Sequence, residues 1–524
     1  MESFFGYCFL ELQSYKHILN FEIEKERKDF KLIKMCKTFF LQWKWLPLYS
    51  QMGKLQYYLW MALERFGANG ISFLSNICLS YFVMPKEYGV VASLAIFTNI
   101  IFVLLDCGMS DGIMRYKNAT EKDFNTLFWF NTFMGVMLCV TYNILAPFVA
   151  DYLEIPETEG VMRLMGFGAI LSAMTISQAT KQRYTLNFKK MSLINLATVA
   201  SMAATCIIMG WLGCGYWAVA MLTFGFSFYM LLYLFIFTKW NIKFEFSIET
   251  FKDLWRFGVN LLFTVLTTQV AQNLYSFMLG KFSPTQSSFF VQGQKLENAP
   301  MRSMESTITY TSFVMIAKET EEEKRRSELV KVYGMIAVIM FCFMGVAFVL
   351  SEPLIALIFP EKWLPVVPYF RLLVVLGFFQ AMSRFQQNFY KIYNRTRTLA
   401  KLVLCENMLL IVSCLILFFL KVDIFEIIYL TICVTMIMNL VSLYIGSRIA
   451  LIRYREFVKL LVRAIIVGIS AIVPTYFLVE YIDQNIIAVF LGLLLYAVLV
   501  IGMGLLLMRN YFTMMLNKII KRKI

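Results

Sequence analysis

Charged and amide side chains recur at helical spacing inside several long apolar segments of this chain. Arg65, Asn69 and Asn76, in the first such segment, are four and seven residues apart, which places them on one face of a helix. Similar polar stripes run along the seventh, eighth and tenth apolar segments. The candidates to line a substrate cavity are Arg65, Asn69, Asn76, Asn260, Gln272, Asn273, Lys295, Asn298, Arg302, Glu305, Gln380, Arg384 and Gln387.

The charged members of these stripes predict a wet, cationic cavity. A charged side chain inside the hydrocarbon costs at least ~2.5–3.5 kcal/mol, so it normally faces a partner or a water-filled cavity. The cations are Lys295, Arg302 and Arg384, and only two acidic residues, Glu297 and Glu305, lie near them. Positive charge is therefore left over, which favours an anionic passenger such as a phosphate or pyrophosphate head group. Neighbouring amides and hydroxyls suit sugars, and we predict a transporter that works by alternating access.

Two other interpretations of the stripes stay open. Ser, Thr, Asn and Gln side chains also join helices to one another in a dry membrane bundle. Arg65 lies beside Glu64 near the predicted cytoplasmic end of its segment, so its side chain could instead extend to the interface.

Motifs for other chemistry are missing from the sequence. There is no GxxxxGK[ST] motif for ATP, no HExxH, GxSxG or CxxC, and the single histidine is His17, so we expect no enzyme, no metal site and no cofactor. Asp106 and Glu406 are the acidic residues best placed inside the membrane. Each is a candidate for H+ or Na+ coupling, or for a buried partner of an arginine.

The composition determines the elements that must position these side chains. Hydrophobic residues make up 59% of the 524 residues and charged residues only 16%, against about a quarter charged in soluble domains. Apolar stretches of about 20 residues predict an all-α polytopic membrane protein. We expect fourteen spans, at 57–83, 87–107, 125–149, 161–182, 191–212, 215–238, 255–279, 286–316, 329–350, 366–391, 399–420, 424–447, 460–479 and 485–508.

Charge alternates between successive loops and predicts the topology. One loop, for example, carries Lys181, Arg183, Lys189 and Lys190, whereas the loop before it, 151–160, has only acidic charges. Basic loops face the cytoplasm, so an even number of spans places both termini there. The net charge of +15 therefore reflects topology and attraction to anionic lipid, and we expect no nucleic-acid partner.

Residues 1–52 precede the first span and carry many charges. We interpret them as a cytoplasmic extension, with a start at Met52 as the alternative.

Several stretches resemble a known family of transporters. They include "LERFGANGISFLSNICLSYFVMPKEYGVVASLAIF" (63–97), "LLDCGMSDGIMRY" (104–116), "LGCGYWAVAM" (212–221) and "LIFPEKWLPVVPYFRLL" (357–373). Their order and spacing are similar to those of the Wzx-type, colanic-acid-exporter-like polysaccharide transporters of the multidrug/oligosaccharidyl-lipid/polysaccharide (MOP) exporter superfamily.

The resemblance implies a fold of two pseudo-symmetric six-helix lobes, here 53–247 and 248–447, followed by two further spans and a basic tail in 448–524. It also implies a multi-pass flippase of the bacterial cytoplasmic (inner) membrane. Such a flippase moves undecaprenyl-pyrophosphate-linked oligosaccharide repeat units to the periplasmic leaflet for O-antigen, capsule or exopolysaccharide synthesis. Its expected partners are that polyprenyl-linked oligosaccharide, the lipid bilayer, and a polysaccharide polymerase with its chain-length machinery.

Alternatives of the same fold are a multidrug or small-molecule exporter and a lipid II-type flippase. A drug exporter for cations would need carboxylates in its cavity, whereas this cavity is predicted to be cationic. A polymerase or ligase of the O-antigen type would need a long periplasmic loop, and the outward loops here are short.

A short repeat supports the two-lobe interpretation. "RFGAN" at 65–69 opens the first span and "RFGVN" at 256–260 opens the seventh. An offset of six spans is what a duplicated six-helix lobe produces. We predict that these segments are corresponding elements whose asparagines begin the polar faces.

Overall fold

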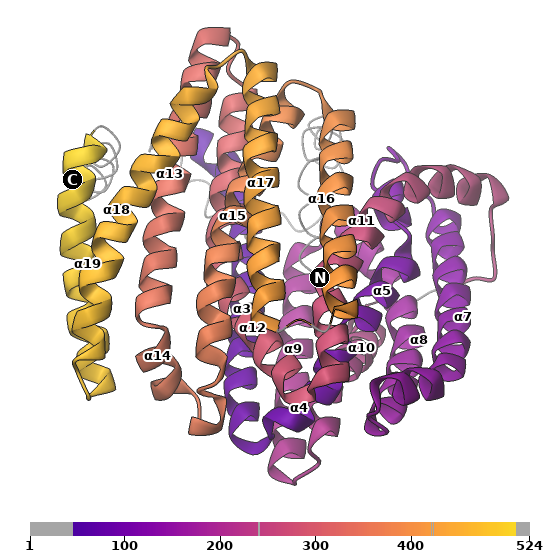
Figure 1. Ribbon diagram of the computed structural model, residues 1–524. Helices are drawn as coiled ribbons and strands as arrows, with labels where there is room; N and C mark the ends of the chain where they lie inside the picture. Colours follow the sequence, from indigo (N-terminus) through magenta and orange to yellow (C-terminus); the bar gives the residue numbers. More distant parts are fainter. Residues whose placement is uncertain (1–45, 239–241, 421, 423, 510–524) are drawn as a thin grey trace, which may run out of the picture. The chain divides into compact units, whose positions relative to one another are not determined.

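The computed structural model describes residues 46–238, 242–420, 422 and 424–509, and every regular element in those ranges is a helix (Figure 1). The first half contains α3 (Leu46–Phe82), α4 (Pro85–Ser93), α5 (Ala95–Asp106), α6 (Met109–Ile113), α7 (Glu121–Leu153), α8 (Glu157–Tyr184), α9 (Phe188–Trp211) and α10 (Tyr216–Phe237). The second half contains α11 (Ile248–Phe282), α12 (Pro284–Ala317), α13 (Glu322–Val349), α14 (Ser351–Ile358), the short η3 (Glu361–Trp363), α15 (Val366–Ile392), α16 (Thr396–Phe419), α17 (Ile424–Ala450), α18 (Tyr454–Glu480) and α19 (Asn485–Leu507).

Each predicted span coincides with a helix, the second being divided between α4 and α5. Within the described ranges, eleven helices are long and apolar enough to cross a membrane. The helices α3, α11 and α12 are longer still, at 37, 35 and 34 residues, yet they are not among the eleven. Polarity rather than length excludes them, because they carry three of the four polar stripes.

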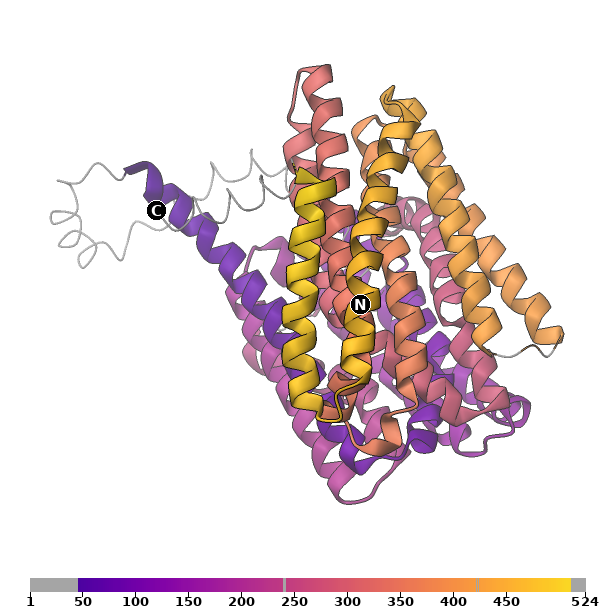
Figure 2. The same cartoon turned by 60° about the vertical axis from the view of Figure 1, so that its left-hand side comes forward.

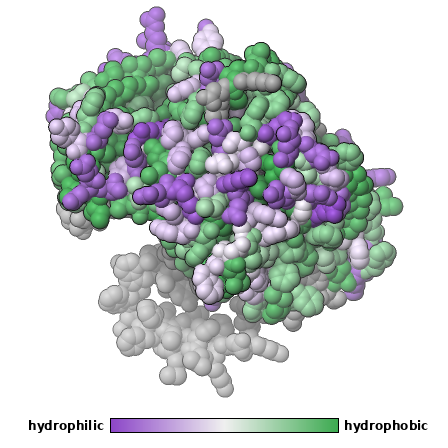
Figure 3. All heavy atoms as spheres, turned by 60° about the horizontal axis from the view of Figure 1, so that its bottom comes forward, coloured by the Kyte–Doolittle hydropathy of each residue, from purple (hydrophilic) through white to green (hydrophobic). Residues whose placement is uncertain are grey.

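The outer surface is that of a membrane protein. Large apolar side chains such as Leu74, Phe133, Phe235 and Leu506 are more than half exposed, and hydrophobic residues cover broad areas of the face drawn in Figure 3. Soluble monomers rarely expose apolar surface on this scale. The chain is therefore a multi-pass membrane protein.

The chain divides into two compact units that do not follow chain order. Unit 1 comprises residues up to 76, 97–151 and 156–265, and unit 2 comprises 77–96, 152–155 and the residues from 266 onward. The division falls inside α3, α5, α7 and α11. The predicted lobes are continuous in sequence, whereas these units are not, and both copies of the short repeat, 65–69 and 256–260, belong to unit 1.

Unit 1 contains close contacts between helices and a sharp turn between α5 and α6. Helix α7 packs on α8 where Gly135 meets Ala173, since a Cβ on Gly135 would lie 2.7 Å from that of Ala173. Cys107 and Gly108 take positive φ angles of 49° and 74°, which end α5 and turn the chain into α6. Leu254, from the first half of α11, is buried in the core cluster beside this turn.

Unit 2 has an aromatic core that also holds the last two helices. The centre of the Phe457 ring lies 5.0 Å from that of Tyr333 and 5.4 Å from that of Phe389. Helix α18 packs closely on α13, where a Cβ on Gly468 would lie 1.9 Å from the Phe341 ring. Helices α18 and α19 run side by side (Figure 2), so they are part of unit 2.

Candidate functional site

Four helices of unit 2 bring together most of the predicted polar residues. Helix α12 packs along α15, and the Asn388 side-chain amide donates to the Thr309 carbonyl at 3.1 Å. Helix α16 joins α11 where Asn407 Nδ2 donates to Thr268 Oγ1 at 2.9 Å. Unit 2 therefore contains α12, α15, α16 and the part of α11 from residue 266 onward.

On α15 the predicted stripe lies beside two residues that hydrogen-bond to other helices. Gln386, which is fully buried, donates through Nε2 to Asn439 Oδ1 of α17 at 2.8 Å. Gln380, Arg384 and Gln387 are instead half-buried. Gln386 and its neighbour Asn388 thus make hydrogen bonds between helices, and Gln380, Arg384 and Gln387 remain partly accessible.

Arg384 and Glu406 are electrostatic partners. The Arg384 guanidinium on α15 acts on the carboxyl group of Glu406 on α16, which is half-buried. Ion coupling and partnership with an arginine both remain predictions for Glu406, and Arg384 is the arginine that acts on it.

Lys295 of α12 reaches α4. Its side chain is exposed, and Nζ donates to the hydroxyl of Tyr88 at 2.5 Å and lies 4.8 Å from the centre of that ring. Asn298 is half-buried one turn further on. The side chains of Arg302, Glu305 and, on α11, Asn260 are outside what the structure describes.

The second half of α11 carries the remaining predicted amides of unit 2. Gln272 is exposed, and Asn273 Nδ2 donates to the Gln269 carbonyl at 2.8 Å within the same helix. Gln272 is therefore the more accessible of the two, and Asn273 is half-buried.

In unit 1, the acidic neighbour of Arg65 makes the helix contact. Glu64 accepts hydrogen bonds from Ser192 Oγ at 2.8 Å and Asn195 Nδ2 at 3.0 Å, both on α9, whereas Arg65 is exposed. Further along α3, Asn69 is half-buried and Asn76 is 6% exposed. Sequence periodicity placed Arg65 on the polar face but did not identify Glu64 as a residue that joins α3 to α9.

Asp106 closes the turn between α5 and α6. It is 2% exposed, and its Oδ1 accepts from the Ser110 backbone N–H at 3.2 Å and from the Ser110 hydroxyl. Thr180 of α8 in turn donates to Ser110 Oγ at 3.0 Å. In this position Asp106 caps α6 and ties it to α8.

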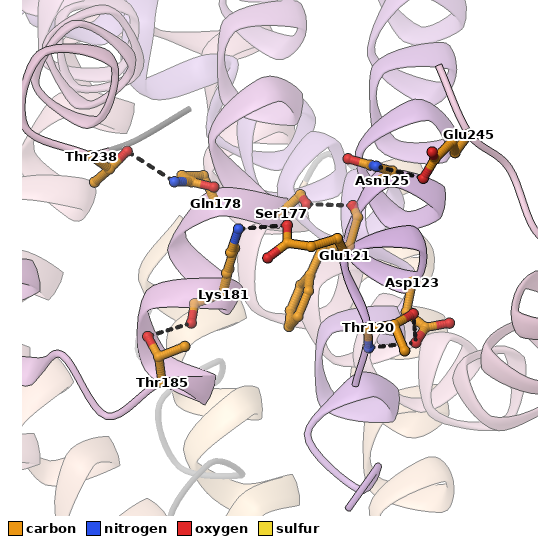
Figure 4. Close-up of polar contacts among 11 residues, drawn as sticks. Thr120, Glu121, Asp123, Asn125, Ser177, Gln178, Lys181, Thr185, Thr238 and Glu245 are labelled. Carbon is orange, nitrogen blue, oxygen red and sulfur yellow. Dashed lines mark hydrogen bonds and ion pairs between the residues drawn. The ribbon is translucent and has the colours of Figure 1, made fainter. Parts of the chain in front are cut away.

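A second polar cluster of unit 1 surrounds the segment 242–247. Figure 4 shows the Lys181 ammonium directed at Glu121, 2.6 Å away, and Gln178 Nε2 directed at Thr238 Oγ1, 2.9 Å away. The Trp129 indole N–H donates to the Lys243 carbonyl at 3.0 Å. These groups satisfy one another, so we interpret the cluster as a latch for this segment.

A tyrosine in the segment that follows α6 bonds to α11. The Tyr116 hydroxyl donates to Asp253 Oδ2 at 2.8 Å. Burial, together with this hydrogen bond, raises the pKa of Tyr116 well above its usual range, so the hydroxyl keeps its proton.

Among the described residues, no group of three or more His, Cys, Asp or Glu side chains could hold a metal ion. The polar face of unit 2 offers hydrogen-bonding groups and charge. Its described cations, Lys295 and Arg384, suit an anion, and its half-exposed amides suit hydroxyl groups.

Comparisons with known proteins agree with the predicted class. A family model described as polysaccharide biosynthesis protein matches residues 78–368. The teichuronic acid biosynthesis protein TuaB of Bacillus subtilis (strain 168) is 23% identical over 290 residues, covering 53% of this chain and 59% of the relative. The lipopolysaccharide biosynthesis protein WzxC of Escherichia coli (strain K12) is 20% identical over 332 residues, covering 62% of this chain and 67% of the relative. The chain thus spans about three fifths to two thirds of the length of these relatives.

A solved structure has the same fold. The lipid II flippase MurJ, in an inward closed conformation, superposes with a TM-score of 0.65 at 14% identity, covering 87% of this chain and 99% of that chain. At this identity the likeness concerns the fold alone, and it agrees with the predicted MOP-type arrangement of helices.

Proposed function

Because this chain belongs to the polysaccharide biosynthesis protein family, we propose that it is a lipid-linked oligosaccharide flippase. Its substrate would be a repeat unit joined to a polyprenyl lipid through pyrophosphate, carried from the cytoplasmic to the periplasmic leaflet of the bacterial inner membrane. The protein would act by binding and conformational change, with no covalent step. Both termini would lie in the cytoplasm, as the positive charge of alternate loops indicates.

The observation that carries the proposal is the half-exposed polar face of α15. Gln380, Arg384 and Gln387 keep access to solvent, although Gln386 of the same helix is fully buried in a helix contact. A cation inside a membrane helix is expensive, and this one is neither packed away in a dry interface nor placed at the end of its helix. A water-filled passage for a charged solute explains that placement.

Each described group has a task in this function. Arg384 would bind an oxygen of the pyrophosphate, because a guanidinium offers paired N–H donors to phosphate oxygens. Lys295 would add a second positive charge, and Gln380, Gln387 and Asn298 would offer hydrogen bonds to sugar hydroxyls. These groups act in binding, and the alternation of access would be a change of the fold around them.

Glu406 would compete with a bound phosphate for the Arg384 guanidinium. When it is ionised, its carboxylate acts on Arg384, and a bound phosphate would have to replace that interaction. We propose that binding of H+ or Na+ at Glu406 weakens this competition and couples transport to an ion gradient. Asp106 is a less favourable candidate for coupling, because it caps α6.

The test uses the source strain with the gene deleted and complemented by variants. Arg384→Ala should lose at least about nine tenths of surface polysaccharide, since removing a charged hydrogen-bonding partner costs about 1.5–3 kcal/mol, and lipid-linked repeat units should accumulate. Arg384→Lys, which keeps the charge, should retain part of the export. Arg448→Ala is the matched control, because Arg448 is exposed and bonds only Tyr444 of its own helix at 3.1 Å among the contacts described.

Membrane levels of each variant would be measured by immunoblot. Normal surface polysaccharide in Arg384→Ala at normal protein level would refute the cationic passage. Unchanged polysaccharide in the deletion strain, together with altered sensitivity to toxic small molecules, would favour the small-molecule exporter instead.

A further inference from the structure

Two signature stretches, far apart in the sequence, meet in unit 2. Tyr88, from the stretch "PKEYG", packs against Trp363, from "PEKW", with ring centres 5.5 Å apart and the rings nearly perpendicular at 88°. Trp363 is fully buried, and its indole N–H donates to the Ser80 carbonyl at 3.0 Å. Next to it, Lys362 Nζ donates to the Tyr81 carbonyl at 3.0 Å. The η3 segment therefore holds the end of α3 and the start of α4.

Helix α12 packs directly on α4 and on Trp363. A Cβ on Gly89 would lie 1.9 Å from the Pro284 carbonyl oxygen, so the backbones of α4 and α12 touch with no side chain between them. Phe289 of α12 packs on Trp363 with ring centres 6.1 Å apart. Since these contacts involve backbone and buried rings, the Tyr88 ring has little freedom to move.

Lys295 lies at the edge of this rigid cluster. The Tyr88 ring is 1% exposed, whereas Lys295 is exposed and donates through Nζ to the Tyr88 hydroxyl at 2.5 Å. The ammonium also lies 4.8 Å from the ring centre, within the range of a cation–π contact. A lysine side chain otherwise samples many rotamers, and ordering it costs up to about 2 kcal/mol. Here a buried acceptor localises it.

The same row of α12 has unused hydrogen-bonding capacity. Phe289, Gln292 and Lys295 follow one another at intervals of three residues, so Gln292 lies between the two contacts just described. Gln292 is 1% exposed, and neither atom of its amide has a hydrogen-bond partner among the described residues. Buried amides are normally satisfied, so a ligand oxygen or a water would find partners here.

We propose that Tyr88, supported by Trp363, is a positioning residue that holds the Lys295 ammonium as a phosphate-binding group. This inference rests on the proposed function, in which the passenger carries a pyrophosphate. It assigns a task to the two signature stretches, which is to fix one cation on α12. The ligand chemistry is phosphate, whether on a lipid head group or free.

The first experiment measures the contact itself in the purified full-length protein. Acetylation of Lys295 by a limiting amount of acetic anhydride is followed by mass spectrometry. Tyr88→Phe keeps the ring and removes the acceptor, so Lys295 should be acetylated about fivefold faster, the factor expected for one lost hydrogen bond. Lys281 is the matched control, because it lies 4.0 Å from the centre of the Tyr152 ring in a cation–π contact. Its rate should not change in Tyr88→Phe.

The second experiment measures binding of two probes, a short polyprenyl pyrophosphate and inorganic pyrophosphate. Tyr88→Phe should weaken binding about fivefold, and Lys295→Met by at least as much, whereas Tyr152→Phe should have no effect. A loss with both probes indicates recognition of phosphate alone. A loss with the lipid probe alone indicates that the lipid head group must be seated first.

Three results would overturn the inference. An unchanged acetylation rate in Tyr88→Phe would mean that Tyr88 does not hold Lys295. Faster acetylation with wild-type binding of both probes would mean that the contact serves no ligand. Normal export by Lys295→Met while Arg384→Ala loses export would reject this inference and leave the proposed function intact. Failure of the proposed function would appear separately, as normal export by Arg384→Ala.

Discussion

Replacing Gly258 with alanine would push a methyl group into the backbone of the turn between α5 and α6. The added Cβ would lie 2.1 Å from the Cys107 carbonyl oxygen and 3.2 Å from its carbonyl carbon. Cys107 already has a positive φ of 49°, a conformation that leaves little room to relax. We therefore expect Gly258→Ala to destabilise unit 1.

The size of the effect follows from two opposing contributions. Overpacking of a well-packed site costs about 1–3 kcal/mol, and a clash with backbone belongs at the upper end of that range. Alanine gains about 1 kcal/mol over glycine inside a helix. The net loss is about 2 kcal/mol, which corresponds to a fall of about 4–8 °C in the unfolding midpoint of a unit of this size.

The copy of the repeat in the middle of α3 provides a matched variant. In Gly67→Ala the new Cβ would lie 2.8 Å from Cδ2 of Leu196, the end of a side chain that can rotate away. Its unfolding midpoint should therefore stay near that of the wild type. Gly70→Ala measures only the stabilisation that alanine gives relative to glycine inside a helix, because nothing lies within 4 Å of that Cβ.

The assay is thermal unfolding of the purified full-length protein in detergent, followed with a thiol-reactive fluorophore. Cys107, Cys139 and Cys206 are buried in unit 1, so their reaction reports its opening. A wild-type midpoint for Gly258→Ala, with the expected rise for Gly70→Ala, would show that α11 does not press on this turn. Equal losses for Gly67→Ala and Gly258→Ala would refute the distinction between side-chain and backbone contacts.

Two further predictions concern other contacts of the fold. Trp129→Phe removes the hydrogen bond to the Lys243 carbonyl, so trypsin cleavage after Lys243 should become about fivefold faster, and an unchanged rate by mass spectrometry would contradict the latch. Gly89→Ala would place a methyl group 1.9 Å from the Pro284 carbonyl oxygen, whereas Gly502→Ala meets nothing within 4 Å. The first variant should lose most of its monodisperse peak in size-exclusion chromatography and the second should keep it, and similar profiles would argue against the α4–α12 contact.

The helices themselves could be predicted from sequence because the signals are local. A run of apolar residues long enough to cross the bilayer forms a helix wherever it lies, since its backbone groups must bond within the segment. All fourteen predicted spans coincide with helices. Three of these helices, α3, α11 and α12, are too polar to be among the eleven that qualify as membrane-crossing by length and composition.

The role of each polar residue could not be predicted from the sequence in the same way. Gln386 and Gln387 are neighbours in the sequence, yet the first is buried against Asn439 and the second is half-buried. Likewise Glu64 bonds α9 while Arg65 is exposed. Periodicity groups residues by face, but it contains no information about which face meets another helix.

The sequence by itself determined the membrane class, the positions and order of the fourteen spans, and the family. These depend on hydropathy, on the helical repeat and on short signatures, all of which are read along the chain. Only the tertiary structure decided that the compact units divide α3 and α11 internally, and that Tyr88 and Lys295, 207 residues apart, are in contact. The physical reason is that such contacts depend on how helices distant in the sequence pack together, which no local pattern specifies.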